Sequence, residues 1–266
     1  MTHRILFVVE GAVKEPAILE SLKTLMPGIG NCVVWANKNH IYNLYRQLTA
    51  DADQDIFALV QANDTEGVLT GYRREDFDQV YLFFDYDGHV GMKAGEPLGD
   101  DVIESMLTLF DNETEAGKLY ISYPMAEALE HTPLDREKFL RLTAKCKGVN
   151  CRSKESCSDR EACKKEPHYK TIAGDEKPLK IPFAEYTRSD WHRIIAYHLN
   201  KVEFLVNDRD AMPATLHEQR AIFGKQLEKY IGRDCPVVTV LSGFPTFLLD
   251  YYGVERCVHR LRPADH

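Results

Sequence analysis

Short apolar runs alternate with helical segments along the first half of the chain, and this alternation limits the fold more than any other feature. The apolar runs have the length of strands and lie at residues 4–9, 32–35, 78–84 and 118–122. Helical spacing fills the intervals, at residues 16–25, 40–48, 56–62 and 101–110. Strands that alternate with helices are typical of a parallel sheet with crossover connections. The sequence therefore predicts an α/β domain, a parallel sheet flanked by helices, over residues 1–132.

The second half of the chain has a different character, because a cysteine-rich segment interrupts all periodicity. Further helices are predicted at residues 135–144, 189–206, 213–231 and 247–252, and one more beginning at Pro124. We therefore expect an insert that contains the cysteine segment at residues 133–187, and a mostly helical C-terminal region at residues 188–266.

No segment of the 266 residues has the pattern of a membrane span or an export signal. The apolar run before Glu10 is too short for the apolar region of a signal peptide, and no later run approaches the length that crosses a bilayer. We therefore expect a cytoplasmic protein with no membrane partner. An odd number of cysteines, seven, without an export signal also argues against a disulfide framework.

Acidic residues directly follow two of the predicted strands. The letters "EG" at Glu10 end the first run, and "DYDG" ends the third run with Asp85 and Asp87. Residues two apart in an extended chain point the same way, and functional groups of an open parallel sheet gather at the carboxyl ends of its strands. Three carboxylates there would repel one another unless a divalent cation such as Mg²⁺ lay between them. The pattern predicts a Mg²⁺ site for phosphoryl transfer, although Asp and Gly are also ordinary turn residues.

The stretch "VVEGAVKEPAILESL", together with "DYDG", resembles the TOPRIM domain of topoisomerases, bacterial primases and the nucleases of the OLD family. Its start is similar to the RloB-like branch, which reads Glu-Gly-x-x-x-Glu-Pro and is matched by Glu10, Gly11, Glu15 and Pro16. The stretch "ISYPMAEAL" is similar to the Pro-x-x-Glu element of the family, with Glu127 as its acid. The resemblance extends from residue 4 to residue 131.

This resemblance implies a metal-dependent nuclease, often part of bacterial antiphage defence and often encoded beside an ABC-type ATPase. In that mapping Glu10 would be the general acid/base or a metal ligand, and Asp85 and Asp87 would hold Mg²⁺ or Mn²⁺. Glu127 and Glu15 would support a second metal or orient the residues around the first.

Four cysteines crowd into one polar segment of the second half. Cys146, Cys151, Cys157 and Cys163 have the spacing C-x4-C-x5-C-x5-C, with no apolar periodicity around them. Four thiolates would fold such a segment around a tetrahedral Zn²⁺, and His168 is near enough in sequence to replace one ligand. An iron–sulfur cluster and free or redox-active thiols are the alternative interpretations. The other three cysteines lie in apolar surroundings and are expected to be buried: Cys32, Cys235 and Cys257.

Positive charge gathers around the same cysteines, although the whole chain has a formal net charge of −8. Residues 145–170 contain eight lysines and arginines against four acidic residues. Such a segment could approach a phosphate backbone, or it could be a solvated loop with scattered charge. Lys14 and His89 could also contact phosphate near the acids, although an exposed lysine and a loop histidine are the simpler interpretations.

The acids and the resemblance together favour a divalent-metal-dependent endonuclease that acts on DNA or RNA, including tRNA, and the resemblance implies an ABC-type ATPase as partner. One alternative is a non-catalytic binding or regulatory subunit that docks through its basic cysteine loop. Another is a nucleotidyl transferase of the primase type. The C-terminal helices could pack on the α/β domain or form a surface for a partner or a homodimer. A P-loop is absent, because no G-x-x-x-x-G-K-[ST] occurs.

Overall fold

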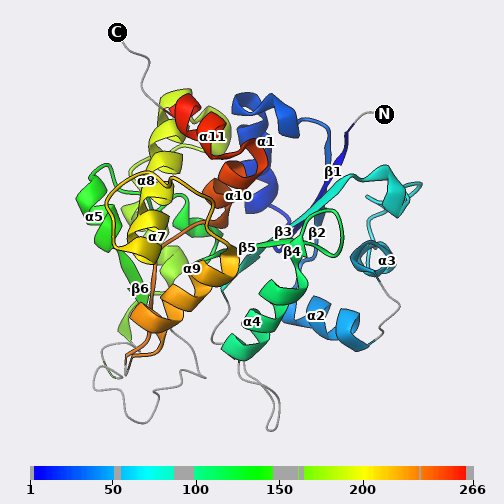
Figure 1. The fold of residues 1–266 in the computed structure, drawn as a ribbon, viewed down its shortest axis with the longest axis horizontal. Helices are drawn as coiled ribbons and strands as arrows, with labels where there is room; N and C mark the ends of the chain where they lie inside the picture. Colours follow the sequence, from blue (N-terminus) through cyan, green and yellow to red (C-terminus); the bar gives the residue numbers. More distant parts are fainter. Residues whose placement is uncertain are drawn as a thin grey trace. The chain divides into compact units, whose positions relative to one another are not determined.

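The computed structural model describes residues 3–50, 55–86, 99–145, 161, 165–233 and 235–261. The chain divides into two compact units, whose elements are labelled in Figure 1. The sheet unit comprises Met1–Asp85, Asp101–Tyr120 and Pro182–Tyr186, and the helical unit comprises Tyr86–Asp100, Ile121–Ile181 and Thr187–His266.

Five strands in the order β2-β1-β3-β5-β4 form the central sheet. They are β1 (Ile5–Val9), β2 (Cys32–Ala36), β3 (Gln79–Asp85), β4 (Asp111–Asn112) and β5 (Gly117–Ser122). β1 pairs in parallel with both β2 and β3, and β4 pairs antiparallel with β5. The predicted α/β fold with a mainly parallel sheet is confirmed. All four predicted strands are present, and the short β4 is an addition that the sequence pattern did not indicate.

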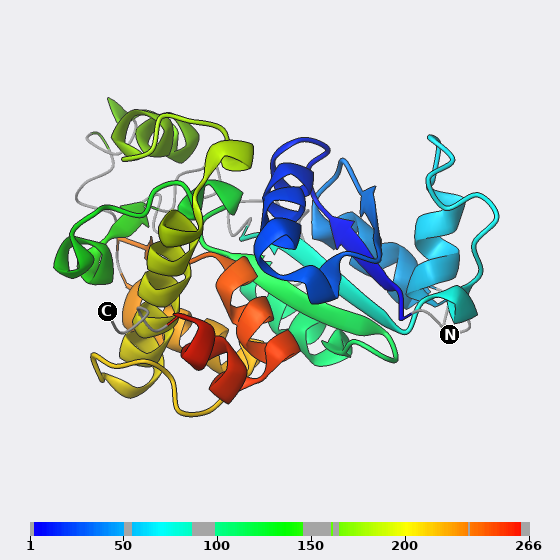
Figure 2. The same ribbon diagram turned by 90° about the horizontal axis from the view of Figure 1, so that it is seen from above.

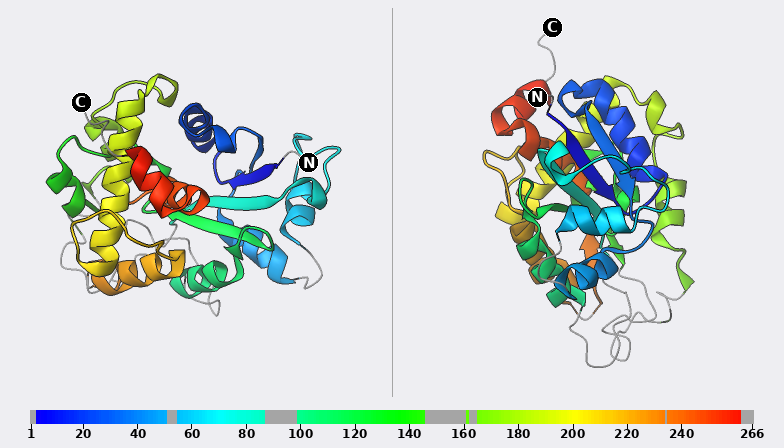
Figure 3. Two further views of the ribbon diagram at one scale, coloured as in Figure 1. Left: turned by 45° about the horizontal axis from the view of Figure 1, so that its top comes forward. Right: turned by 90° about the vertical axis from the view of Figure 1, so that its right-hand side faces the viewer.

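Helices cover both faces of this sheet. α1 (Lys14–Leu25) lies on one face, and α2 (Ile41–Ala50) and α4 (Gly99–Leu109) lie on the other (Figure 3). Because both faces are covered, every residue of β1 is buried, which accounts for its unbroken apolar run. The remaining elements of the unit are α3 (Ile56–Ala62), η1 (Pro27–Ile29), η2 (Arg74–Asp76) and η4 (Phe183–Glu185).

The helical unit is organised around α8 (Arg188–Asn207). α8 begins at a capping box in which Thr187 and Asp190 satisfy each other's backbone amides. It contacts α5, α9, α10 and α11, and Figure 2 shows α10 and α11 beside it. These helices are α5 (Arg136–Arg141), α9 (Gln219–Gln226), α10 (Gly243–Tyr252) and α11 (Val254–Leu261). The helix predicted at residues 189–206 is therefore confirmed, and its apolar residues Trp191, Ile194, Ile195, Leu199 and Val202 are buried.

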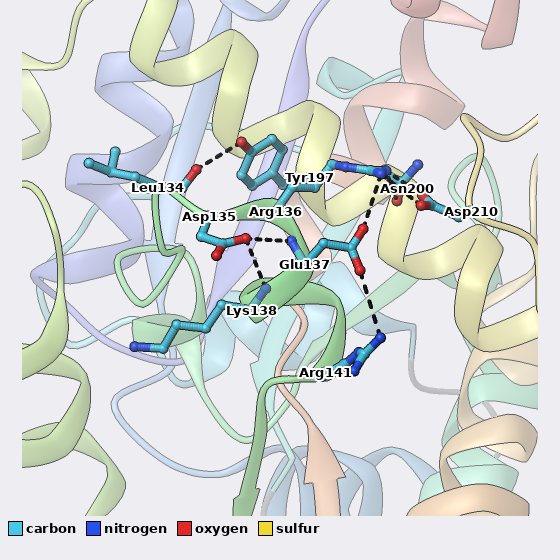
Figure 4. Close-up of polar contacts among 9 residues, drawn as sticks. All are labelled: Leu134, Asp135, Arg136, Glu137, Lys138, Arg141, Tyr197, Asn200 and Asp210. Carbon is cyan, nitrogen blue, oxygen red and sulfur yellow. Dashed lines mark hydrogen bonds and ion pairs between the residues drawn. The ribbon is translucent and has the colours of Figure 1, made fainter.

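Polar contacts attach α5 and the loop before it to α8 (Figure 4). Both terminal nitrogens of the Arg136 guanidinium donate hydrogen bonds to the Asp210 carboxylate, and Nη1 also donates to Asn200 Oδ1 at 3.2 Å. The Tyr197 hydroxyl donates to the carbonyl of Leu134 at 2.9 Å. Two segments that are far apart in sequence are thereby held in one unit.

The smaller elements of this unit correct two predicted helices. These elements are η3 (Ala126–Ala128), β6 (Thr143–Lys145), α7 (Tyr169–Glu176), η5 (Leu227–Ile231) and β7 (Val237–Thr239). The helix expected to open at Pro124 is only the single turn η3, because Tyr123 is extended and exchanges two backbone hydrogen bonds with Leu241. The helix expected at residues 135–144 ends at Arg141, because the next residues pair with β7 as β6.

The long helix predicted at residues 213–231 is also wrong at its start. α9 begins only at Gln219, after an extended Glu218. Just before it, the His217 ring lies 2.7 Å from Glu203 Oε2 on α8, and residues 211–218 have an irregular backbone. α10 begins four residues before the predicted terminal helix, and α11 was not predicted. Among the residues that the structure describes, no helix has both the length and the apolar character needed to cross a bilayer.

Candidate active site

Glu10 and Asp85 occupy the carboxyl ends of two neighbouring strands in the sheet unit. β1 and β3 are parallel, with Val9 opposite Phe83, so the residues that follow them emerge at the same edge. The Glu10 amide donates to the Phe83 carbonyl at 3.1 Å, and the Glu10 carbonyl accepts from the Lys38 amide at 2.8 Å. Hydrogen bonds on both sides therefore hold the backbone of Glu10 as a continuation of β1.

The side chain of Glu10 reaches across to the neighbouring strand. Its Oε2 accepts a hydrogen bond from the Asp85 amide at 3.0 Å. Both residues are half-buried, so an ion in solution can approach them. The structure thus brings the Glu10 carboxylate to the backbone of Asp85, and these are two of the three acids for which the sequence predicts a Mg²⁺ site, although 75 positions separate them along the chain.

Glu15 lies in the first turn of α1 and is only 6% exposed. Its Oε1 accepts a hydrogen bond from the Gly11 amide at 3.0 Å. Its carboxylate also fills the space beside Gly11, because a Cβ at that position would lie 2.7 Å from Glu15 Oε2. Glu15 therefore contacts the peptide that follows Glu10.

Glu127 belongs to the helical unit, in η3, and is 5% exposed. The Nζ of Lys170, on α7, lies 3.7 Å from its Oε1. Burial, reinforced first by the charge of Glu127, raises the pKa of the neighbouring Tyr169 well above its usual value. Lys170 is one of the basic residues that the sequence grouped with the cysteine segment, and nothing in the sequence pattern indicated that it meets a buried acid.

His131 completes this group of polar side chains between η3 and α7. Its Nδ1 lies 3.2 Å from the Tyr169 hydroxyl, and its Nε2 lies 3.3 Å from Glu176 Oε2. Burial lowers the pKa of His131, although Glu176 acts in the opposite direction. No sequence signal distinguishes His131, because an isolated histidine has no informative spacing.

Several predicted site residues lie outside the described part of the chain. They are Asp87, His89, Cys146, Cys151, Cys157 and Cys163. His168 is described and is the exposed N-terminal cap residue of α7. Within the described residues, no group of three or more histidine, cysteine or acidic side chains is arranged to hold a metal ion.

The expectation that the remaining three cysteines are buried is wrong for two of them. Cys257 is buried, whereas Cys32 and Cys235 are half-buried. Cys32 is the first residue of β2, and β2 is an edge strand, so one side of it has no neighbouring strand to cover it. Partial burial raises the pKa of the Cys32 thiol, and the nearby Lys23 opposes this shift.

The donors that Glu10 and Asp85 present are carboxylate oxygens, which suit Mg²⁺ or Mn²⁺ better than a metal that prefers sulfur or nitrogen. A pair of carboxylates at the ends of parallel strands, with further oxygen ligands from water or substrate, is an ordinary way to bind Mg²⁺. The residues present therefore fit a hard divalent cation.

No protein family, no curated protein and no solved structure matches this chain.

Proposed function

We propose that this chain is a divalent-metal-dependent endonuclease that cleaves nucleic-acid phosphodiesters with a TOPRIM-like site. The observation that supports this proposal is the hydrogen bond from the Asp85 amide to Glu10, at the carboxyl ends of two neighbouring parallel strands. Ligands of open α/β sheets bind at this edge. The resemblance of Glu10, Gly11, Glu15 and Pro16 to the RloB-like pattern favours the same chemistry.

Bound Mg²⁺ or Mn²⁺ would supply a Lewis acid that polarises the scissile phosphate and lowers the pKa of an attacking water. Glu10 and Asp85 would hold the ion, with Asp87 as a third carboxylate. Because the Glu10 backbone is hydrogen-bonded to Phe83 and Lys38, its carboxylate is presented without rearrangement of the strand end. Glu10 could also accept or deliver the proton of the reaction.

The wider role is proposed from the resemblance alone. We infer an effector of bacterial antiphage defence that acts in the cytoplasm with an ABC-type ATPase. In the same proposal, the four cysteines from Cys146 to Cys163 hold a structural Zn²⁺, and the basic residues around them approach the nucleic acid.

The test is incubation of the purified chain with tRNA, single-stranded DNA and duplex DNA in Mg²⁺ or Mn²⁺. Fragments should appear with at least one substrate and disappear when EDTA removes the metal. Glu10→Gln and Asp85→Asn should lower the rate by about 100-fold or more, as loss of an acid/base or metal-binding group does. Glu75→Gln is the matched control, because Glu75 is an exposed acid of the same unit that pairs with Arg73.

Each other outcome names a different function. Cleavage that both Glu10→Gln and Asp85→Asn retain would contradict the proposed site. Nucleotide incorporation in place of fragments would indicate a transferase. Binding of nucleic acid without turnover, with or without the ATPase partner, would indicate a docking subunit.

The Asp85 amide would still have an oxygen acceptor in Glu10→Gln, so this variant should unfold at the same urea concentration as the unaltered chain.

A further inference from the structure

The peptide group that joins Glu10 to Gly11 is hydrogen-bonded at both ends. Its carbonyl accepts from the Lys38 amide at 2.8 Å, and its N–H donates to Glu15 Oε1 at 3.0 Å. The preceding amide, that of Glu10, donates to Phe83 at 3.1 Å. Three partners from three segments therefore fix the backbone on both sides of the Glu10 α-carbon.

Of these three partners, Glu15 is the only side chain. It is 6% exposed, and a buried carboxylate is stable only when it is hydrogen-bonded or paired. The Gly11 N–H satisfies one of its oxygens, and its position in the first turn of α1 places its charge near the positive end of the helix dipole. Val13, the N-cap residue of α1, makes no side-chain cap hydrogen bond, and the bond from Gly11 to Glu15 links this helix to the loop that follows β1.

The backbone of the loop comes close to the Glu15 carboxylate at Gly11. A Cβ on Gly11 would lie 2.7 Å from Glu15 Oε2 and 3.2 Å from Oε1, which is closer than carbon and oxygen pack. Glycine at position 11 therefore lets the carboxylate approach the backbone, and the carboxylate holds the backbone in return.

We propose that Glu15 is a positioning residue, which orients Glu10 by binding the Gly11 amide and is not itself a metal ligand. The effect on catalysis rests on the proposed function, in which Glu10 is a metal ligand or the general acid/base. Partners that orient the ligands of a metal site typically change affinity or activity by about 10–100-fold when they are removed. Glu15 should act in that range, through Glu10.

The discriminating substitution is Glu15→Gln compared with Glu15→Ala. Glutamine keeps an oxygen that can accept from Gly11 N–H but loses the negative charge that makes a carboxylate a stronger ligand for a divalent cation than a neutral amide. We expect Glu15→Ala to weaken Mn²⁺ binding about 10–100-fold and to lower kcat by a similar factor, and Glu15→Gln to lose less than about tenfold in either. Glu20→Ala is the control, because Glu20 is an exposed acid on the same helix.

Gly11→Ala tests the same contact from the other side. The added methyl group should push the Glu15 carboxylate away and reproduce the loss seen in Glu15→Ala. In the double variant the two losses should not add, because both act by breaking one hydrogen bond. Additive losses would mean that Gly11 acts independently of Glu15 and would contradict the proposal.

Hydrogen exchange of the Gly11 amide gives a readout that needs neither metal nor turnover. In ¹⁵N-glycine-labelled protein, the signal that Gly11→Ala removes should be protected in the unaltered chain and in Glu15→Gln, and should exchange at least about tenfold faster in Glu15→Ala. If Glu15→Gln lost Mn²⁺ affinity as fully as Glu15→Ala while keeping this protection, Glu15 would be a ligand and the proposal would be overturned. If the unaltered chain cleaved nothing, the proposed function would fail, and amide protection and Mn²⁺ affinity would still decide the role of Glu15.

Discussion

Replacement of Gly117 by alanine should destabilise the sheet unit strongly, because the added methyl group would meet a filled core. Among the glycines of this unit whose surroundings the structure describes, only Gly11 is as crowded, and there the neighbouring atoms belong to a side-chain end that can move away. Gly117 begins β5 with φ of +102°, a backbone conformation that costs an L-residue about 1–2 kcal/mol. A Cβ there would lie 2.6 Å from Leu82 Cδ1 and 3.4 Å from Val80 Cγ1. Both residues lie on β3 and are fully buried, so neither can move into solvent.

The size of the effect follows from these two terms. Overpacking of a filled core costs about 1–3 kcal/mol, so the two terms together should reach about 2–5 kcal/mol. That is a large fraction of the about 5–15 kcal/mol by which a typical domain is stable. Alanine also restricts the unfolded chain, which returns about 0.4–1 kcal/mol.

Gly71→Ala is the matched control for the backbone term. Gly71 has φ of +83°, but nothing lies within 4 Å of the position of its Cβ. Both variants place alanine at a positive φ and restrict the unfolded chain alike, so the difference between them reports mainly the clash with Leu82. We expect Gly117→Ala to be less stable than Gly71→Ala by about 1–3 kcal/mol.

Urea unfolding followed by tryptophan fluorescence measures this difference. The chain has two tryptophans, and one lies in each unit: Trp35 in β2 and Trp191 in α8. With Trp191 replaced by phenylalanine in every sample, Trp35 reports the sheet unit alone. Equal midpoints for Gly117→Ala and Gly71→Ala would refute the steric argument and the packing of β5 against β3 on which it depends.

Three further predictions concern the helical unit. Burial, assisted by the charge of Lys201, keeps the pKa of His198 well below 6.5. The unfolded chain therefore binds an extra proton below pH 6.5, and the free energy of unfolding should fall by up to about 1.4 kcal/mol per pH unit on acidification. Urea midpoints measured against pH should show a smaller slope in His198→Gln. Burial opposes ionisation of Glu203, but hydrogen bonds from His217 and other donors hold its pKa below 4.5. The stability that ionised Glu203 contributes is therefore present above pH 4.5 and is lost as the pH falls through the lowered pKa. The difference in urea midpoint between the unaltered chain and Glu203→Gln should narrow below pH 4.5. Arg136→Lys should lower the thermal midpoint, because lysine donates from a single nitrogen and cannot reproduce the parallel contacts of two guanidinium nitrogens with Asp210 (Figure 4).

Local pattern was sufficient to predict four of the five strands of the sheet, all except the short β4. β1 and β3 are buried on both faces, so their residues must be apolar without interruption, and such runs are visible in any sequence. The same logic located Glu10 and Asp85 at strand ends, because each is the first charged residue after an apolar run. α1 and α8 were predictable for a related reason, since their apolar residues recur at the helical period.

Local pattern was misleading where distant segments supply the hydrogen bonds. Tyr123 pairs with Leu241, the residues after Arg141 pair with β7, and His217 binds Glu203. Each contact holds an extended or irregular backbone where the composition favours a helix, because a backbone group bonded to a remote strand or side chain has no need of helical partners. Sequence spacing has no access to such partners.

The candidate site likewise has features that the sequence predicts and features that depend on tertiary packing. The sequence by itself determined which acids stand at the ends of strands, because burial dictates where an apolar run must stop. Only the tertiary structure decided that the Glu10 carboxylate meets the Asp85 amide and that Glu15 turns back to the amide of Gly11. The register of two parallel strands and the choice of side-chain rotamer make these contacts, and both are settled when the chain packs.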